Sequence, residues 1–332
     1  MVAPLGDKKR IDVAVAVVFN HRGEVLWGCR PEGKPYAGYW EFPGGKVEAG
    51  ETVWQALVRE LREELDIECL AGARWFIVEH DYEHAHVRLH LYRVWTHRGE
   101  PKSLEGQQFA WANLNDPNFS PILPATAPLL PVLAQPRLMA LSDFHADFDA
   151  CSQRLQQGLS AVAEPVYVQF REPGLRGGAL VKAFEQARRV VEPFKHGTLL
   201  INSATRQALL AAAADGLLDA GTVAAYPVHL TEQHLLEMQA PPSSGLAVWG
   251  ASAHSEASLS KAHALGLRYA VVGAVKETPS HPGQEGLGWT GFEAMTEPAR
   301  LPVFAIGGLS RADLHEACAH GAHGIAMMRQ FD

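Results

Sequence analysis

The chain has 332 residues, and 47% of them are hydrophobic, so it can bury more than one core and two domains are expected. Its formal net charge of -8 argues against a nucleic-acid polymer as partner, because such binding needs many Lys and Arg side chains to neutralise phosphates. Charge or proline breaks the longest apolar stretches, which argues against a membrane span. Four widely separated cysteines and no signal or transit segment predict a reduced, cytoplasmic protein.

The first part of the chain alternates apolar and polar residues in short runs, which is typical of half-buried strands. One convincing helix, at residues 52–65, interrupts them, so an α+β domain is expected. Six prolines between Pro117 and Pro136 then mark a break in the pattern. We expect one domain over residues 1–134 and a second over residues 135–332. The strand-like runs of the first domain are residues 11–18, 24–28, 74–79 and 86–95.

In the last of these runs, histidines alternate with the apolar residues Val87 and Leu89. The alternation places His86 and His90 together on the polar face of a strand. A solvated face is favoured there over a histidine metal site.

From Leu138 onward, short apolar runs alternate regularly with helical segments. Eight such strands with seven intervening helices, in under 200 residues, are the pattern of a compact (β/α)8 barrel. The second domain is therefore expected to be an α/β TIM barrel.

The helix at residues 52–65 carries a cluster of carboxylates. Thr52 and Gln55 form a capping box that fixes its start, and its apolar residues fall on one face. Glu60, Glu63 and Glu64 occupy an adjoining arc of about 100°. Their mutual repulsion costs on the order of 0.2 to 0.5 kcal/mol per pair. Either the arc is a solvated acidic face, or it binds a hard divalent cation, which prefers carboxylate oxygens.

The stretch GKVEAGETVWQALVRELREELDI, residues 45–67, resembles the Nudix box, which favours the metal site and implies a Nudix fold for the first domain. One position departs from the family pattern, since Asp66 stands where glycine is usual; Asp tolerates the left-handed conformation expected there. Arg59 is expected to pair with a carboxylate such as Glu51. The matching positions are Gly45, Glu51, Arg59, Glu60, Leu61, Glu63, Glu64 and Ile67.

The wider match, from Val13 to about Leu133, is similar to MutT-type enzymes. That similarity implies a nucleoside triphosphate substrate such as 8-oxo-dGTP, hydrolysed to the monophosphate and pyrophosphate with Mg²⁺, or alternatively Mn²⁺. Glu60 or a neighbouring carboxylate would orient or deprotonate the attacking water. The ligands of the metals would be the Gly44 carbonyl, Glu60, Glu63, Glu64 and Glu105.

The resemblance also implies substrate contacts, at Arg30, Glu41, Phe42, Pro43, Gly44 and Thr126. Thr126 stands where the family has a base-reading asparagine, and a hydroxyl lacks the paired donor and acceptor of an amide. The alternative substrates are therefore diphosphates related to thiamine, which the second domain suggests.

Residues 138–330 resemble thiamine phosphate synthase in a series of short segments, among them VQFRE, VHL, ASAHS and AIGG. The resemblance implies a phosphate site at the carboxyl ends of the strands, where turns rich in glycine bind phosphate through backbone amides. Glycines needed only for packing are the alternative. The candidate residues are Gln169, Arg171, Asn202, Thr278, Ser280, Gly307 and Gly308.

Two departures weigh against synthase activity. The family's two Mg²⁺-binding aspartates align with Ser203 and His234. Without these carboxylates a hard cation has no evident site. We expect synthase activity to be absent or very weak, and the barrel to bind a thiamine-related phosphate as a ligand-binding or regulatory module.

Overall fold

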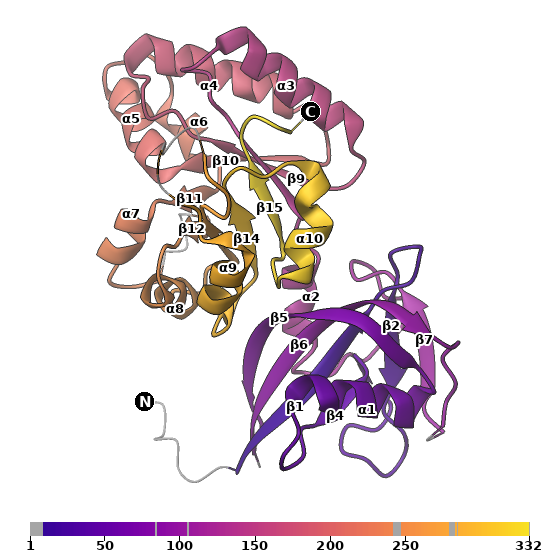
Figure 1. Cartoon of the computed structure of the whole chain (residues 1–332). Helices are drawn as coiled ribbons and strands as arrows, with labels where there is room; N and C mark the ends of the chain where they lie inside the picture. The colour runs from indigo at the N-terminus through magenta and orange to yellow at the C-terminus, as the bar shows by residue number, and fades with distance from the viewer. Residues whose placement is uncertain are drawn as a thin grey trace. The chain divides into compact units, whose positions relative to one another are not determined.

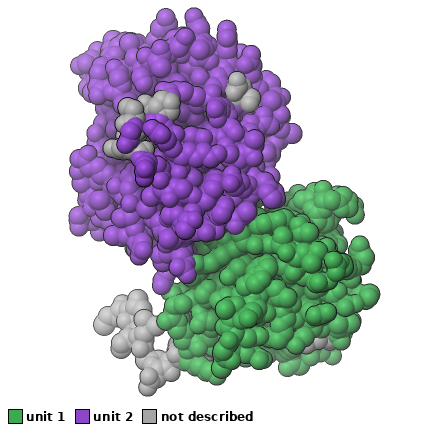
Figure 2. Space-filling view, in the orientation of Figure 1, with its two compact units in different colours: residues 1–134 green, residues 135–332 purple. Residues whose placement is uncertain are grey.

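A computed structural model describes residues 9–83, 85–104, 106–241, 247–278, 283 and 285–331. Two expected site residues, Glu105 and Ser280, lie outside the described residues. The chain divides into two compact units, Met1–Ala134 and Gln135–Asp332, coloured separately in Figure 2.

The first unit is built from two small sheets and one long helix (Figure 1). In the first sheet the strand order is β4 (Gly44–Lys46), β1 (Lys9–Val18), β6 (Ala85–Arg98) and β5 (Glu68–Asp81). The second has the order β3 (Trp40–Glu41), β2 (Val25–Cys29) and β7 (Gln108–Ala112). The helices are α1 (Val53–Leu65), the 3-10 turn η1 (Ala127–Leu129) and α2 (Leu130–Leu133). The expected α+β fold is confirmed.

Helix α1 begins and ends as its sequence predicts. Thr52 is the N-cap and forms a capping box with Gln55, while Asp66 ends the helix in the left-handed conformation, with φ 56°. Leu57, Leu61 and other apolar residues of α1 pack against one face of the first sheet. The carboxylates on the adjoining arc are thereby held near the loop that precedes the helix.

The expectation of a solvated histidine face on β6 is wrong for His90. Its side chain is buried, at 8% exposure for the residue, and its Nε2 lies 2.7 Å from Asp12 Oδ1. Strand β1 runs parallel to β6 and brings Asp12 opposite Arg88. Asp12 of the neighbouring strand β1 bonds to His90 on the polar face of β6. The alternation of residues within β6 alone does not reveal such a partner.

The second unit is a closed barrel of eight parallel strands in the order β10-β11-β12-β13-β14-β15-β8-β9, which confirms the expected barrel. No described helix of the chain is long and apolar enough to cross a membrane. The barrel strands are β8 (Leu138–Leu141), β9 (Val166–Phe170), β10 (Gly197–Asn202), β11 (Val228–Leu230), β12 (Val248–Ser252), β13 (Tyr269–Gly273), β14 (Val303–Ile306) and β15 (Gly324–Met327).

Helices surround these strands on the outside of the barrel (Figure 1). They are α3 (Phe148–Ala161), α4 (Gly177–Val191), α5 (Ser203–Ala214), α6 (Ala220–Ala224), α7 (Glu232–Glu237), α8 (Glu256–Ala264), α9 (Gly288–Thr296), η2 (Arg311–Asp313) and α10 (Leu314–Ala319). Their apolar faces form one large core with the outward side chains of the strands.

The barrel interior has a smaller core of its own, in which Tyr167, Tyr269 and Phe304 pack together. His229 lies against this core, with its ring nitrogens 3.2 Å from the Tyr269 hydroxyl and 3.1 Å from Ser252 Oγ. Burial, and secondarily the charge of Arg171, lowers the pKa of His229 to about 3. The imidazole is therefore neutral inside the barrel at neutral pH.

Candidate active site

The first unit contains a cavity of about 670 Å³. Apolar residues of β1 and β6 line it, among them Val13, Val87 and Leu89. Eight of the residues expected at the active site also line the cavity, namely Arg30, Glu41, Phe42, Pro43, Gly44, Glu60, Glu64 and Thr126. Residues from six separate segments of the chain thus meet at one concave site, which is the usual form of a small-molecule site.

Glu63 is placed differently from its two neighbours on α1. It is not among the residues that line the cavity, and its side chain is 59% exposed. One of its oxygens accepts a hydrogen bond from Arg59 at 3.1 Å. In this state of the protein only Glu60 and Glu64 of the helix carboxylates reach the cavity.

Two glycines make room for the Glu60 carboxylate and for the strand beneath it. A Cβ atom on Gly45 would lie 2.1 Å from the Glu60 carboxyl group. A Cβ on Gly44, which has φ 147°, would lie 2.1 Å from the carbonyl oxygen of Ala14 on β1. Strand β4 therefore approaches helix α1 and strand β1 more closely at these two positions than a residue with a side chain would allow.

Arg59 anchors the carboxylates of this region, as predicted. Its Nε donates to Glu51 Oε1 at 2.7 Å and its NH1 to Glu60 Oε1 at 2.9 Å. The hydrogen bond from Arg59 lowers the pKa of Glu51 to about 2, and the same bond raises the pKa of Arg59. Arg59 thus stabilises the acidic arc through ion pairs rather than by lining the cavity.

The donor set fits a hard divalent cation. Among the described residues no three or more His, Cys, Asp or Glu side chains converge on one point, because Glu60 and Glu63 both turn toward Arg59. Glu60, Glu64 and Gly44 nevertheless line the same cavity, and together they offer carboxylate oxygens and a backbone carbonyl. Oxygen donors of this kind suit Mg²⁺ or Mn²⁺.

A second polar group of the cavity centres on Arg30. Its NH1 pairs with Glu41 Oε1 at 2.5 Å, and its Nε donates to the Pro35 carbonyl at 2.8 Å. Burial raises the pKa of Glu41, and the Arg30 charge opposes that shift. Thr126, which is 5% exposed, also lines this cavity.

Sequence reasoning missed several residues of the cavity. Tyr36 and Tyr82 contribute aromatic rings, and Lys34 and Lys46 contribute positive charge. Lys46 directly follows the glycine pair, a position that could have been recognised as suitable for a phosphate contact. Tyr36 and Tyr82 are far apart in the sequence, and no periodic pattern connects them.

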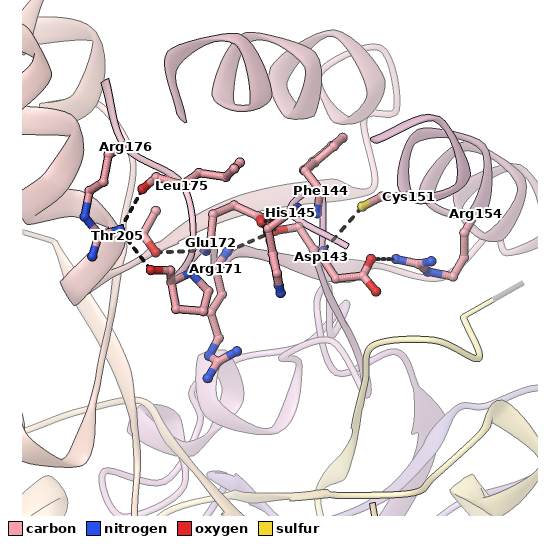
Figure 3. Close-up of polar contacts among 12 residues, drawn as sticks. Asp143, Phe144, His145, Cys151, Arg154, Arg171, Glu172, Leu175, Arg176 and Thr205 are labelled. Atoms are coloured by element: carbon pink, nitrogen blue, oxygen red, sulfur yellow. Dashed lines mark hydrogen bonds and ion pairs between the residues drawn. The ribbon is translucent and has the colours of Figure 1, made fainter. Parts of the chain in front are cut away.

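The barrel brings two of its expected residues, Gln169 and Asn202, together at the carboxyl ends of β9 and β10. Asn202 Nδ2 lies 3.3 Å from Gln169 Oε1, and both side chains are buried. Asn202 also caps α5 by accepting from the Ala204 amide at 3.1 Å. Arg171, one residue beyond β9, is exposed, and its guanidinium points away from the neighbouring polar network (Figure 3).

The remaining barrel candidates are positioned by close packing. Gly307 and Gly308 have φ 107° and 65°. A Cβ on Gly307 would meet Ala274 Cβ at 2.5 Å, and one on Gly308 would meet Lys276 Cβ at 2.8 Å. Thr278 follows that segment and is partly exposed. Close packing and positive φ angles both favour glycine at these two positions.

Ser203 and His234 bond to each other. The serine Oγ lies 2.6 Å from His234 Nδ1, and it accepts from the Thr231 amide at 3.0 Å. The other ring nitrogen of His234, Nε2, lies 3.3 Å from Gln207 Nε2. The pair is therefore satisfied within the protein and offers no carboxylate to a cation.

A buried carboxylate that the sequence did not single out connects two strands of the barrel (Figure 3). Glu172 is fully buried and accepts from Ser142 Oγ at 2.5 Å and from the amides of Phe144 and His145, each at 3.0 Å. Its own amide donates to Thr205 Oγ1 at 3.0 Å. These bonds satisfy a carboxyl group that would otherwise be costly to bury, so Glu172 fixes the segment after β8.

The first unit is an α+β domain with a glycine-rich loop and helix carboxylates at one cavity, and the second is a closed (β/α)8 barrel. Residues 8–133 match the NUDIX domain family, and residues 138–331 match the thiamine monophosphate synthase family. The chain belongs to both families, and its first unit is a Nudix hydrolase.

Individual relatives match one unit or the other. The CTP pyrophosphohydrolase of Escherichia coli (strain K12) is 40% identical over 124 residues, which are 37% of this chain and 90% of that protein. An 8-oxo-dGTP diphosphatase of Haemophilus influenzae is 38% identical over 37% of this chain and 91% of its own length. A putative thiamine-phosphate synthase 2 of Aquifex aeolicus is 29% identical over 59% of this chain and 97% of its own length.

Proposed function

We propose that the first unit hydrolyses nucleoside triphosphates to monophosphate and pyrophosphate, that Mg²⁺ is its cofactor, and that 8-oxo-dGTP is among its substrates. The observation that carries the proposal is the shared cavity of Glu60, Glu64 and Gly44 with Arg30 and Glu41. Relatives that act on 8-oxo-dGTP and on CTP support the substrate class. The cellular role would be to remove damaged nucleotides from the pool before they enter DNA.

The roles of the residues follow from their positions. Gly44, Glu60, Glu64 and, beyond the described residues, Glu105 would hold the metal, with Glu63 joining when it leaves Arg59. A bound divalent cation supplies positive charge to the diphosphate and acidifies a coordinated water. Glu60 orients the attacking water or accepts its proton, and Lys46 at the cavity offers a charge to the phosphates.

Base recognition is proposed to be permissive. Thr126 offers the base a single hydroxyl, whereas Glu41 offers a carboxylate that accepts hydrogen bonds from base N–H groups. Arg30 is already engaged by Glu41 and by the Pro35 carbonyl. We expect 8-oxo-dGTP and CTP to be turned over with kcat/KM values within about a hundredfold, since each base hydrogen bond discriminates by only a few kcal/mol.

A substrate panel tests the proposal. Pyrophosphate release from 8-oxo-dGTP, dGTP and CTP, and phosphate release from thiamine diphosphate, would be measured with Mg²⁺ and again with excess EDTA. We expect turnover of the nucleotides and its loss in EDTA. A clear preference for thiamine diphosphate would replace the proposed nucleotide substrate with a thiamine-related one. Activity that persists in EDTA would show that the reaction does not require the metal.

For the barrel we propose binding of a thiamine-related phosphate without synthase activity. The hydrogen-bonded Ser203 and His234 support the lack of activity, and Arg171, Gln169 and Asn202 support the binding. Calorimetry of the full chain with thiamine phosphate should show saturable heat. Absence of heat would leave the barrel a structural role, and measurable condensation of the pyrimidine and thiazole phosphates would refute the claimed inactivity.

A further inference from the structure

Two tyrosines from separate segments meet at the cavity of the first unit. Tyr36 lies in the segment of residues 31–38 between β2 and β3, and Tyr82 lies in the hairpin between β5 and β6. Both line the cavity, and their ring centroids are 5.7 Å apart with the planes tilted by 50°. Neither tyrosine has a role in the metal binding proposed above.

The backbone of Tyr36 is in a conformation that a bulky residue rarely adopts. Its φ is 60°, whereas the other positive φ angles in this segment belong to Gly33 and Gly38. The Tyr36 side chain is 40% exposed, so burial does not offset the conformational cost. A residue kept in a strained backbone conformation without being buried is typical of a functional position.

The protein fixes the segment that carries Tyr36. Arg30 donates through Nε to the Pro35 carbonyl at 2.8 Å, and its own carbonyl accepts from the Gly38 amide at 2.9 Å. The same guanidinium holds Glu41 at the cavity. Arg30 therefore couples the position of the Tyr36 ring to that of the carboxylate that faces the substrate.

Tyr82 connects the hairpin to the segment that carries Thr126. The Ala125 amide donates to the phenol oxygen of Tyr82, and Ala125 immediately precedes Thr126. The nearby Glu41 carboxylate and, above all, burial raise the pKa of Tyr82. The phenol is therefore neutral, its ring lies against the Tyr36 ring, and Thr126 lines the same cavity.

Aromatic rings beside an aliphatic floor of Val13, Val87 and Leu89 suit a flat, apolar group with a polar edge. A nucleobase has that form, whereas the diphosphate needs the positive charge of Lys46 and of the divalent cation that Glu60 and Glu64 would hold. We propose that Tyr36 and Tyr82 form the base-contacting wall of this cavity, and that Tyr36 retains its strained backbone in order to present its ring to the base. This inference rests on the proposed hydrolysis of nucleoside triphosphates.

The Tyr36→Gly variant separates a functional role from a structural one. Glycine suits a φ of 60°, and this relief offsets the higher entropy of the unfolded chain and the lost ring contacts with Tyr39 and Tyr82, so the melting temperature should change little. Loss of a base-stacking ring should raise KM for dGTP and CTP by about tenfold, with kcat within about twofold. Inhibition by dGMP should weaken by about the same factor, whereas inhibition by inorganic pyrophosphate, which has no base, should not change.

Tyr82→Phe keeps the ring and removes only the oxygen that accepts from Ala125. It should raise KM by up to about fivefold, because the ring that contacts the base loses the hydrogen bond that holds it in place. Tyr92→Phe is the matched control, since Tyr92 lies on the other face of β6 with its ring centroid 5.5 Å from that of Trp54. Unchanged dGMP inhibition in both variants, or an equal loss of dGMP and pyrophosphate inhibition, would overturn the proposal.

Failure of the proposed base-contacting wall can be distinguished from failure of the proposed hydrolysis. If the wild-type chain hydrolyses no nucleoside triphosphate, the proposed function fails, and equilibrium binding of dGMP and CMP to the wild type and the variants still decides the role of the tyrosines. Wild-type turnover with dGMP binding that Tyr36→Gly leaves unaltered would refute the base wall alone.

Discussion

In the first unit, the carboxylates of Glu60 and Glu64 face a cavity beside Gly44, whereas in the barrel the positions expected to hold metal-binding aspartates are Ser203 and His234. Both units keep the architecture of their families, including a closed eight-stranded barrel. The comparison teaches that a domain can keep its fold after its metal-binding residues are replaced. The apolar cores that define the fold do not depend on the few polar residues in its loops.

The largest effect should come from Glu60→Gln, which tests the proposed metal site of the first unit. The amide keeps the shape of the side chain but loses the charge, and turnover of 8-oxo-dGTP should fall on the order of a thousandfold or more. Rates of pyrophosphate release would measure it. Glu68→Gln is the control, because Glu68 pairs with Arg98 at 2.9 Å and does not line the cavity. Near-normal turnover of the Glu60 variant would show that the metal site lies elsewhere.

A smaller loss is expected from Gly45→Ala. The added Cβ would lie 2.1 Å from the Glu60 carboxyl group, which must move. Displacement of a catalytic group by about 1 Å can cost up to a hundredfold, so kcat should fall by about ten- to a hundredfold.

Stability of the Gly45 variant should change little, since the group displaced is the end of a flexible side chain. Gly178→Ala in α4 is the control, because its methyl group would meet nothing within 4 Å. A drop in melting temperature that accounts for the whole loss of activity would contradict this explanation.

The third prediction concerns the barrel and its pH dependence. His229 has a pKa lowered to about 3, so between pH 6.5 and 3 the unfolded state binds the proton that the folded barrel excludes. Stability of the barrel should therefore fall as the pH falls through this window, with a slope of up to about 1.4 kcal/mol per pH unit from this residue.

His229→Gln should flatten that slope, because glutamine does not titrate. Pulse proteolysis in urea at pH 5 and pH 7 follows each unit by the size of the surviving fragment. If the barrel of the variant keeps the acid sensitivity of the wild type, His229 is not its source.

The smallest effect should come from Asp66→Gly, which restores the residue usual in the Nudix box. Glycine relieves the positive φ of 56° but increases the entropy of the unfolded chain and loses the exposed bond to Lys102 at 2.8 Å. The free energy of unfolding should change by no more than about 0.5 kcal/mol, and activity should be unaltered. Denaturant titration measures it, and a loss above about 1 kcal/mol would show that the Lys102 pair matters.

The sequence could predict those parts of the molecule that depend on local spacing. The capping box of Thr52, the left-handed Asp66 and the Arg59–Glu51 ion pair all follow from positions within one helix and its preceding loop. The alternation of strands and helices likewise predicts the barrel, because each strand of such a barrel needs a helix to cover it.

Residues that meet only through tertiary structure could not be predicted in this way. Tyr82 reaches the cavity because β5 and β6 form a hairpin, and Glu172 is satisfied by amides 27 and 28 residues away. His90 looked solvated because the strand that supplies Asp12 is 78 residues earlier in the chain. Single-strand alternation carries no information about the neighbouring strand.

The bond between Ser203 and His234 also bears on how this barrel can change in evolution. A lone Ser203→Asp substitution would bring a carboxylate against the imidazole, while a lone His234→Asp would leave one carboxylate beside a serine hydroxyl. Neither substitution alone places two carboxylates at these positions. A two-carboxylate site here would therefore require changes at both Ser203 and His234.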